Sequence, residues 1–237
     1  MKKILPLIII GLRITLGCMD KRDPIITIVN IGHSDRLEIG RQLGIIKKYS
    51  PKVIALDFYL VPDSLDRDAI LVQELEIIKN TVQVVALHDL YEPDYIWDSL
   101  EVSHPKFKIA NHGFANFGVE DSVIINELPM MQTFNSRQIY CFGYVVAENS
   151  FGVRDKFKNT GDKELKLNLA GLGKNYKLIT ADQLFSGKFK EQDLKDKIVL
   201  MGYLGEKEDY FYLDKGKTKK VNGVEVHASI IEELIDL

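Results

Sequence analysis

Short apolar, β-branched runs alternate with amphipathic helical patterns along the first half of the chain. The runs are Ile25 to Gly32, Val53 to Phe58 and Val82 to Leu87, and the helical patterns between them end near Ser50 and run from about Ser64 to Lys79. A strand that is apolar at nearly every position is buried on both faces, and a helix between two such strands makes a parallel crossover. The alternation therefore predicts an α/β fold: a three-layer α/β/α domain with a mostly parallel central sheet.

The apolar positions within the helical patterns have the spacing of a single buried face. The first helix carries Ile39, Leu43 and Ile46 at positions i, i+4 and i+7, and the second repeats the pattern from Leu71 to Leu75. This spacing places the side chains on one side of a helix with 3.6 residues per turn. Each helix is therefore expected to cover one face of the sheet.

The middle of the chain is less regular. Two short strands are expected on either side of a turn at Glu120-Asp121-Ser122, and a helix is expected from about Arg137 to Glu148. The polar stretch from Asp89 to Lys106 is interpreted as a surface excursion. The stretch from Ser150 to Lys177 is rich in Gly, Lys and Asn, which is typical of a loop or an insertion.

Regular structure returns near the end of the chain. The segment Tyr176 to Gly187 predicts a strand and then a short helix capped by Thr180, and Lys197 to Gly202 predicts a central strand. A last helix is expected from about Val224 to Leu234. Because no repeat or linker divides the sequence, we interpret residues 24–237 as one domain.

Residues 1–23 have the composition of an export segment. Lysines precede an apolar run, and a small residue precedes Cys18, which is the order of a secretion signal. The run is too short and too interrupted for a transmembrane helix. Leu16-Gly17-Cys18 also resembles a bacterial lipobox, in which the cysteine is lipidated, although Arg13 and Thr15 depart from that pattern. One interpretation is a lipoprotein attached to the membrane through Cys18. The alternative is an ordinary signal or a short anchor with an incidental cysteine. Export by any of these routes places the domain outside the cytoplasm.

Charge and cysteine content exclude several classes of function. The net charge is −3 with both signs interspersed, so no basic field is present for a nucleic-acid partner. The two cysteines, Cys18 and Cys141, are too few and too distant for a disulfide framework or a zinc cluster. Cys141 lies in an apolar run and is interpreted as a buried free thiol.

Polar residues at the predicted strand ends are the first candidate ligand-binding residues. Asp57 ends the second strand, Leu87 to Asp89 end the third, and Gly202 to Asp209 follow the last. In a doubly wound sheet, ligands bind outside the carboxyl ends of the strands. These residues are therefore expected along one edge, where they bind a ligand or, alternatively, only cap loops and lead into solvent.

His227 allows two interpretations, because it shares the apolar face of the last helix. It is either a buried histidine that bonds to the backbone or to Asp209 and holds the helix on the sheet, or a ligand-binding or proton-sensing group. His112 and Asp57 could join it around a metal ion, but no H-x-x-x-H or H-E-x-x-H spacing supports a metal site.

The sequence predicts no cofactor and no catalytic constellation. Gly202 to Gly205 follow a strand, as a phosphate-binding loop does, but acidic residues and no amphipathic helix come next. A nucleophile elbow of the form G-x-S-x-G is missing as well.

The closing third resembles the CHASE2 domain, an extracytoplasmic sensor module of bacterial receptors. The matching residues are the strand Leu194 to Gly202, then Asp209, and then the Gly-Val-x-x-His-Ala pattern of Gly223 to Ala228. Lys52 to Phe58 and the His112-Gly-x-x-Asn segment also fit, whereas Ser122 and Ile125 stand where the family has glycine and arginine.

The resemblance implies a sensory or ligand-binding domain without catalysis, whose partner is an unknown small-molecule or protein signal. Transmembrane and output parts normally follow this domain, and the sequence ends at Leu237, so we expect a truncated or stand-alone member. The alternative hypothesis is a hydrolytic α/β enzyme that uses Asp57, Asp209 and His227 at the strand-end edge.

Overall fold

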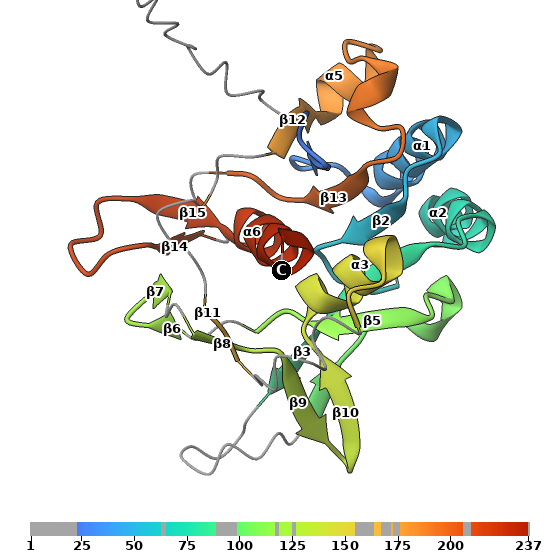
Figure 1. The fold of residues 1–237 in the computed structure, drawn as a ribbon. Helices are drawn as coiled ribbons and strands as arrows, with labels where there is room; N and C mark the ends of the chain where they lie inside the picture. The colour runs from blue at the N-terminus through green and yellow to red at the C-terminus, as the bar shows by residue number, and fades with distance from the viewer. Residues whose placement is uncertain are drawn as a thin grey trace, which may run out of the picture.

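A mostly parallel, seven-stranded sheet lies at the centre of the computed structural model (Figure 1), which describes residues 23–62, 65–88, 99–116, 119–124, 127–154, 164–166, 172, 176–205 and 210–236. Its strands are β1 (Ile26–Asn30), β2 (Val53–Leu56), β3 (Thr81–His88), β4 (Ser99–Glu101), β5 (Asn111–Phe114), β12 (Tyr176–Thr180) and β13 (Ile198–Gly202). The order is β12-β1-β13-β2-β3-β4, and β5 also pairs with β3. Only the β3–β4 pairing in this sheet is antiparallel.

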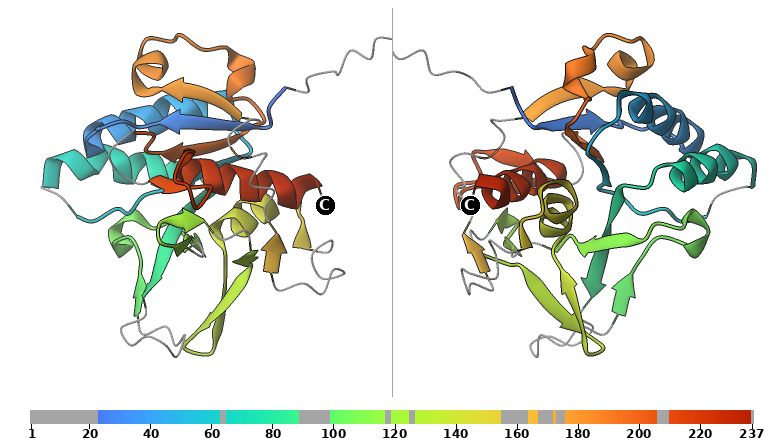
Figure 2. Two further views of the ribbon diagram at one scale, coloured as in Figure 1. Left: turned by 90° about the vertical axis from the view of Figure 1, so that its left-hand side faces the viewer. Right: turned by 45° about the vertical axis from the view of Figure 1, so that its right-hand side comes forward.

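Helices cover both faces of this sheet (Figures 1 and 2). One face carries α1 (Arg36–Ile46) with its 3₁₀ extension η1 (Lys47–Tyr49), α2 (Leu65–Ile77) and α5 (Ala181–Phe185), and the other carries α3 (Phe142–Phe151) and α6 (Gly223–Asp236). The predicted α/β architecture with a mostly parallel sheet is therefore confirmed.

Two hydrophobic cores explain why the central strands are apolar throughout. In β1, Ile26 and Ile28 pack into the core under α3 and α6, whereas Val29 packs into the core under α1 and α2. In β13, Leu200 and Met201 divide between the two cores in the same way. Successive side chains of a strand point to opposite faces, so each strand must be apolar on both.

Side-chain caps start two of the helices, and the cap at Thr180 is the predicted one. Asp35 accepts a hydrogen bond from the Glu38 amide, while the Glu38 carboxylate accepts one from the Asp35 amide. Thr180 and Gln183 form the same reciprocal pair at the start of α5. Such capping boxes satisfy amides that have no partner within the helix.

The predicted helix from Arg137 to Glu148 is wrong in its first turn. Residues Arg137–Tyr140 form strand β10, which pairs antiparallel with β9 (Met131–Phe134), and α3 begins only at Phe142. Asn135 and Ser136 connect the two strands with φ angles of 47° and 61°. Two consecutive residues with positive φ make the tight turn of a β-hairpin, so the chain folds back before the helix can start.

A smaller sheet projects from the carboxyl ends of the central strands. It has the order β15-β14-β7-β6, with β6 (Val119–Glu120), β7 (Val123–Ile124), β14 (Tyr210–Tyr212) and β15 (Lys220–Asn222). Asp121 and Ser122 form the predicted turn with positive φ angles of 51° and 66°. In the predicted loop after Ser150, the described residues include one short strand, β11 (Glu164–Lys166), which pairs with β8 (Glu127–Pro129); most of that loop lies outside the described residues.

Candidate functional site

Asp57 and His227 meet at the carboxyl end of the central sheet. Asp57 directly follows β2, and its amide donates to the Met201 carbonyl oxygen of β13, which fixes its position beside the neighbouring strand. His227 lies in the second turn of α6, and its Nε2 is 3.5 Å from Oδ1 of Asp57. The two side chains are only 10% and 3% exposed, so the pair lies inside the protein.

Gly202 makes this approach possible. A Cβ atom at Gly202 would lie 2.8 Å from Cγ2 of Val224 and 3.3 Å from Cβ of Asp57, so a side chain here would push α6 away from the sheet. The ring of Phe142, at the start of α3, meets the His227 ring edge-on at a centroid distance of 4.8 Å. We call Asp57, Phe142, Gly202, Val224 and His227 the strand-end cluster.

Glycines also bring α3 into this packing. A Cβ atom at Gly113 would lie 2.5 Å from the Cα of Phe142, and one at Gly143 would lie 2.4 Å from Cγ2 of Ile230 in α6. The first glycine lets the start of α3 sit against β5, and the second lets α3 and α6 pack closely. Close packing at Gly202, Gly113 and Gly143 therefore holds the strand-end cluster between the sheet, α3 and α6.

Burial decides the chemistry of His227. It lowers the pKa of the imidazole to about 3, so the ring is neutral at neutral pH even beside the Asp57 carboxyl. The burial of the ring and its packing against Phe142 agree with the structural interpretation of this histidine. The expected bond to Asp209 lies outside the described residues. His227 is buried, and the Asp57 side chain is 10% exposed.

Asn30 closes the same edge of the sheet at the end of β1, and the sequence interpretation missed it. Its Oδ1 accepts hydrogen bonds from the amides of Gly32 and Leu204, each at 3.0 Å, and its Nδ2 donates to the Leu204 carbonyl oxygen. In the loop that was compared with a phosphate-binding loop, the amide of Leu204 is therefore already hydrogen-bonded to Asn30. The available signal was a polar residue that ends an otherwise apolar strand, Ile26–Asn30.

His112 is not part of the strand-end cluster. It lies on β5, which is separated from β2 by β3. Its ring lines a groove of about 610 Å³ between the β3–β4–β5 region and the β9–β10 hairpin. The other lining residues are mainly apolar or aromatic: Val85, Leu100, Val102, Ala110, Phe134, Asn135, Arg137, Gln138, Ile139 and Tyr140. A volume of this size is typical of small-molecule sites.

The groove combines an apolar wall with the polar side chains of His112, Asn135, Arg137 and Gln138. Burial lowers the pKa of His112, against the opposing effect of a hydrogen bond to the Ala110 backbone, so the ring is neutral at neutral pH. Because that bond uses one ring nitrogen, the other remains for a ligand. Arg137 supplies a guanidinium on the exposed first residue of β10. Tyr140 stacks on Tyr144 at a centroid distance of 4.8 Å and connects the groove wall to α3.

The other predicted residues have separate outcomes. Asp209 and Cys18 lie outside the described residues. Cys141 is a buried free thiol at the N-cap of α3, and burial raises its pKa to about 12, which makes it a poor nucleophile. Among the described residues, no group of three or more His, Cys, Asp or Glu side chains has a metal-binding arrangement.

The family model of the CHASE2 domain matches residues 23–237. The chain belongs to the CHASE2 domain family. CHASE2 is a family of extracytoplasmic sensor domains, so the sensory role expected from the sequence is supported at the level of the family. Comparisons with curated proteins and with solved structures gave no match. In the part of this CHASE2 domain that the structure describes, no helix is long and apolar enough to cross a membrane.

Within this CHASE2 domain, the residues that carried the resemblance have mainly a packing role. Gly202, Val224 and His227 all belong to the strand-end cluster, and Gly113 supports it through α3. The sequence pattern that identifies the family therefore describes how α3 and α6 sit on the sheet.

Proposed function

We propose that this CHASE2 domain senses an extracytoplasmic small molecule by binding it in the groove beside His112, without catalysing a reaction. The observation that carries this proposal is the contrast in access. The side chains of Asp57 and His227 are only 10% and 3% exposed. The groove is open to solvent and mainly apolar, and His112 and Arg137 line it. This chemistry suits a ligand with an apolar body and a carboxylate or carbonyl oxygen.

The path from the groove to the rest of the domain supports a signalling role. β10 forms one wall of the groove and leads directly through Cys141 into α3, and α3 packs against α6. A ligand that binds one position of the β9–β10 hairpin more tightly than another would shift the populations of α3 and α6 positions. The signal would then leave through α6.

We further propose that residues 1–23 export the domain and attach it to the membrane, through a lipid on Cys18. The charged and apolar order of this segment supports export, and the family supports an extracytoplasmic location. Cell fractionation with metabolic labelling by a fatty acid tests this step. Wild type should be labelled and should fractionate with membranes, and Cys18→Ser should lose the label. An unprocessed wild-type chain in the cytosol would contradict the proposal.

A thermal-shift screen of carboxylates and other small polar-apolar molecules tests the ligand site. A true ligand should raise the Tm of wild type and lose this effect in His112→Ala and Arg137→Ala. His104→Ala is the matched control, because His104 caps the short helix η2 (Pro105–Phe107) and is not among the residues that line the groove. A ligand whose shift survives both groove substitutions, or depends on His227 alone, would place the site elsewhere.

A further inference from the structure

The edge of the sheet where the strands begin faces the same side as the start of the domain. β1, β2, β3 and β13 are parallel, so their first residues share one edge, which we call the amino edge. Helices α1 and α2 each connect two of these strands, so they end at this edge, and Figure 2 shows α6 ending on the same side as the start of β1. The chain enters β1 here, so an anchor in residues 1–22 would hold the amino edge toward the membrane.

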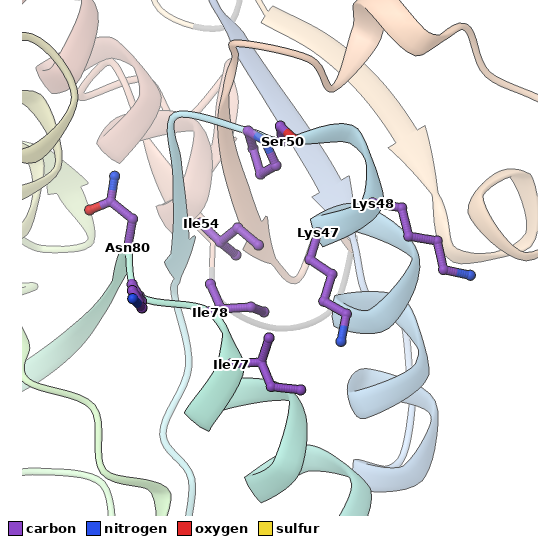
Figure 3. Close-up of a pocket in the computed structure, with 9 residues that line it drawn as sticks. Lys47, Lys48, Ser50, Ile54, Ile77, Ile78 and Asn80 are labelled. Carbon is purple, nitrogen blue, oxygen red and sulfur yellow. The ribbon is translucent and has the colours of Figure 1, made fainter.

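A basic-rimmed pocket opens on the amino edge between the ends of α1 and α2 (Figure 3). Its volume is about 470 Å³, and its lining has no carboxylate: Lys47, Lys48, Ser50, Pro51, Ile54, Ile77, Ile78, Lys79 and Asn80. In Figure 3, Ile54, Ile77 and Ile78 point into the space between the two helices, and Lys48 projects outward. Ile77 is 54% exposed, which leaves an aliphatic side chain at the mouth of the pocket.

The lysines around this pocket are largely unneutralised. Lys47 pairs with Glu74. For Lys48, Lys52 and Lys79, the described part of the chain contains no ion pair with a carboxylate. Lys52 lies beside the pocket, with Nζ 3.9 Å from the ring centroid of Phe151, which is itself 41% exposed.

Helix ends explain only part of this charge. Lys47 and Lys48 lie in the last turn at the end of α1, where cations favour the helix dipole. Lys52 and Lys79 lie just before strands β2 and β3, outside any helix. The acidic end of α6, from Glu232 to Asp236, also reaches the amino edge, on the face of the sheet that carries α3 and Phe151. The pocket beside Lys48 and Lys79 opens between α1 and α2 on the other face.

We propose that the amino edge docks on an anionic phospholipid surface, with Lys48, Lys52 and Lys79 at the headgroups and Ile77 and Phe151 in the interface. Exposed apolar side chains flanked by lysines are the combination that favours binding in the headgroup region. A free phosphate would bind to the lysines but would make no favourable contact with the apolar side chains of Ile77 and Phe151. The proposal rests on the attachment of residues 1–23 given under the proposed function, because that attachment supplies the membrane.

Fluorescence quenching on the full chain tests the docking. A bimane label is placed at Ile77→Cys or, as a matched control, at Val61→Cys, which is 59% exposed and follows β2 at the opposite edge. The labelled chains are mixed with phosphatidylcholine vesicles that carry headgroup spin labels, with or without phosphatidylglycerol. Chains without the added cysteine give the background from Cys18.

The expected result is phosphatidylglycerol-dependent quenching at position 77 and little at position 61. Changing Lys48, Lys52 and Lys79 together to Gln should raise the lipid concentration needed for half-maximal quenching by roughly 100-fold, at about fivefold per lysine. The same charge change at Lys215, Lys217 and Lys219, on the β14–β15 hairpin, should leave it unchanged. Equal quenching at both positions, or no dependence on phosphatidylglycerol, would overturn the proposal.

Two further outcomes separate the alternatives. Inorganic phosphate that changes the emission at position 77 while vesicles do not would identify a free-anion site and overturn membrane docking. Sedimentation with vesicles that lack phosphatidylglycerol reports the attachment of residues 1–23 independently. If sedimentation is lost while phosphatidylglycerol-dependent quenching at position 77 is retained, only the attachment is overturned. If sedimentation is retained while that quenching is lost, only the docking is overturned.

Discussion

The two edges of the central sheet differ in what their polar side chains do. At the carboxyl edge, Asp57, His227 and Asn30 are turned inward and bonded to the protein itself. At the amino edge, Lys48 and Lys79 face solvent around an open pocket. Open α/β sheets commonly bind ligands at the carboxyl edge. In this domain the first turn of α6 packs on Gly202 at that edge, and we expect recognition at the groove beside His112 and at the amino edge.

Removal of the His227 ring should produce the largest loss of stability. His227→Ala would leave a cavity beside Phe142 and remove the ring that lies 3.5 Å from the Asp57 carboxyl. We expect the free energy of unfolding to fall by about 3 kcal/mol, measured by urea denaturation. A loss below about 0.5 kcal/mol, the range of ordinary surface substitutions, would show that the strand-end cluster is not a packing element.

A methyl group at Gly202 should have the next largest effect. Gly202→Ala would place Cβ 2.8 Å from Cγ2 of Val224, so α6 must shift. The expected loss is about 2 kcal/mol, within the range of overpacked cores. Adding Val224→Ala removes the opposing methyl groups. The double variant should therefore lose less unfolding free energy than the sum of the two single variants, which a double-mutant cycle would detect as coupling. Strict additivity would contradict the contact.

Acid should weaken the carboxyl edge over a defined pH range. The unfolded chain binds a proton at His227 below a pKa of about 6.5, whereas burial lowers the folded pKa to about 3. The unfolded state therefore binds more protons between these values. The contribution of His227 to stability is therefore complete above the unfolded pKa and declines as the pH falls toward the folded pKa. Between pH 6.5 and 5.5 the contribution of His227 should fall by about 1 kcal/mol.

The matched measurement is the same pH series on His227→Ala, which retains every other titrating group. The difference in unfolding free energy between wild type and variant should become smaller as the pH falls from 6.5 to 5.5. A difference that grows as the pH falls through this range would mean that the Asp57 carboxyl stabilises a charged imidazole.

The groove histidine should matter least for stability. His112 is half-buried on β5 and lies apart from the strand-end cluster. His112→Ala should change the free energy of unfolding by less than about 1 kcal/mol, because only a partly buried ring is lost. Urea unfolding of both histidine variants side by side makes the comparison direct. A loss at His112 equal to that at His227 would remove the distinction between a binding and a packing histidine.

Local patterns predicted the sheet and its helices because each central strand fills two cores and each helix fills one. Ile39, Leu43 and Ile46 are all buried, as their spacing required. The β9–β10 hairpin was missed because β10 is short and partly polar, and its apolar residues continue into the pattern of α3. A turn at Asn135-Ser136, with two positive φ angles, overrides that pattern.

The candidate site was predictable only in part. The sequence placed Asp57 at a strand end and His227 on an apolar helix face, and both placements hold. It could not show that the two meet, because their contact depends on how α6 crosses the sheet over Gly202. His112 was singled out from the sequence, but its groove is built by a hairpin that the sequence interpretation did not contain.

The most direct test of the closed carboxyl edge is an NMR titration of the His227 ring in the folded domain. Its imidazole nitrogen shifts should stay at neutral values from pH 7 down to the onset of unfolding, since the folded pKa is about 3. A His227 ring that titrates near pH 6.5, the ordinary value of a histidine, would show that solvent reaches the strand-end cluster and would contradict its assignment as packing.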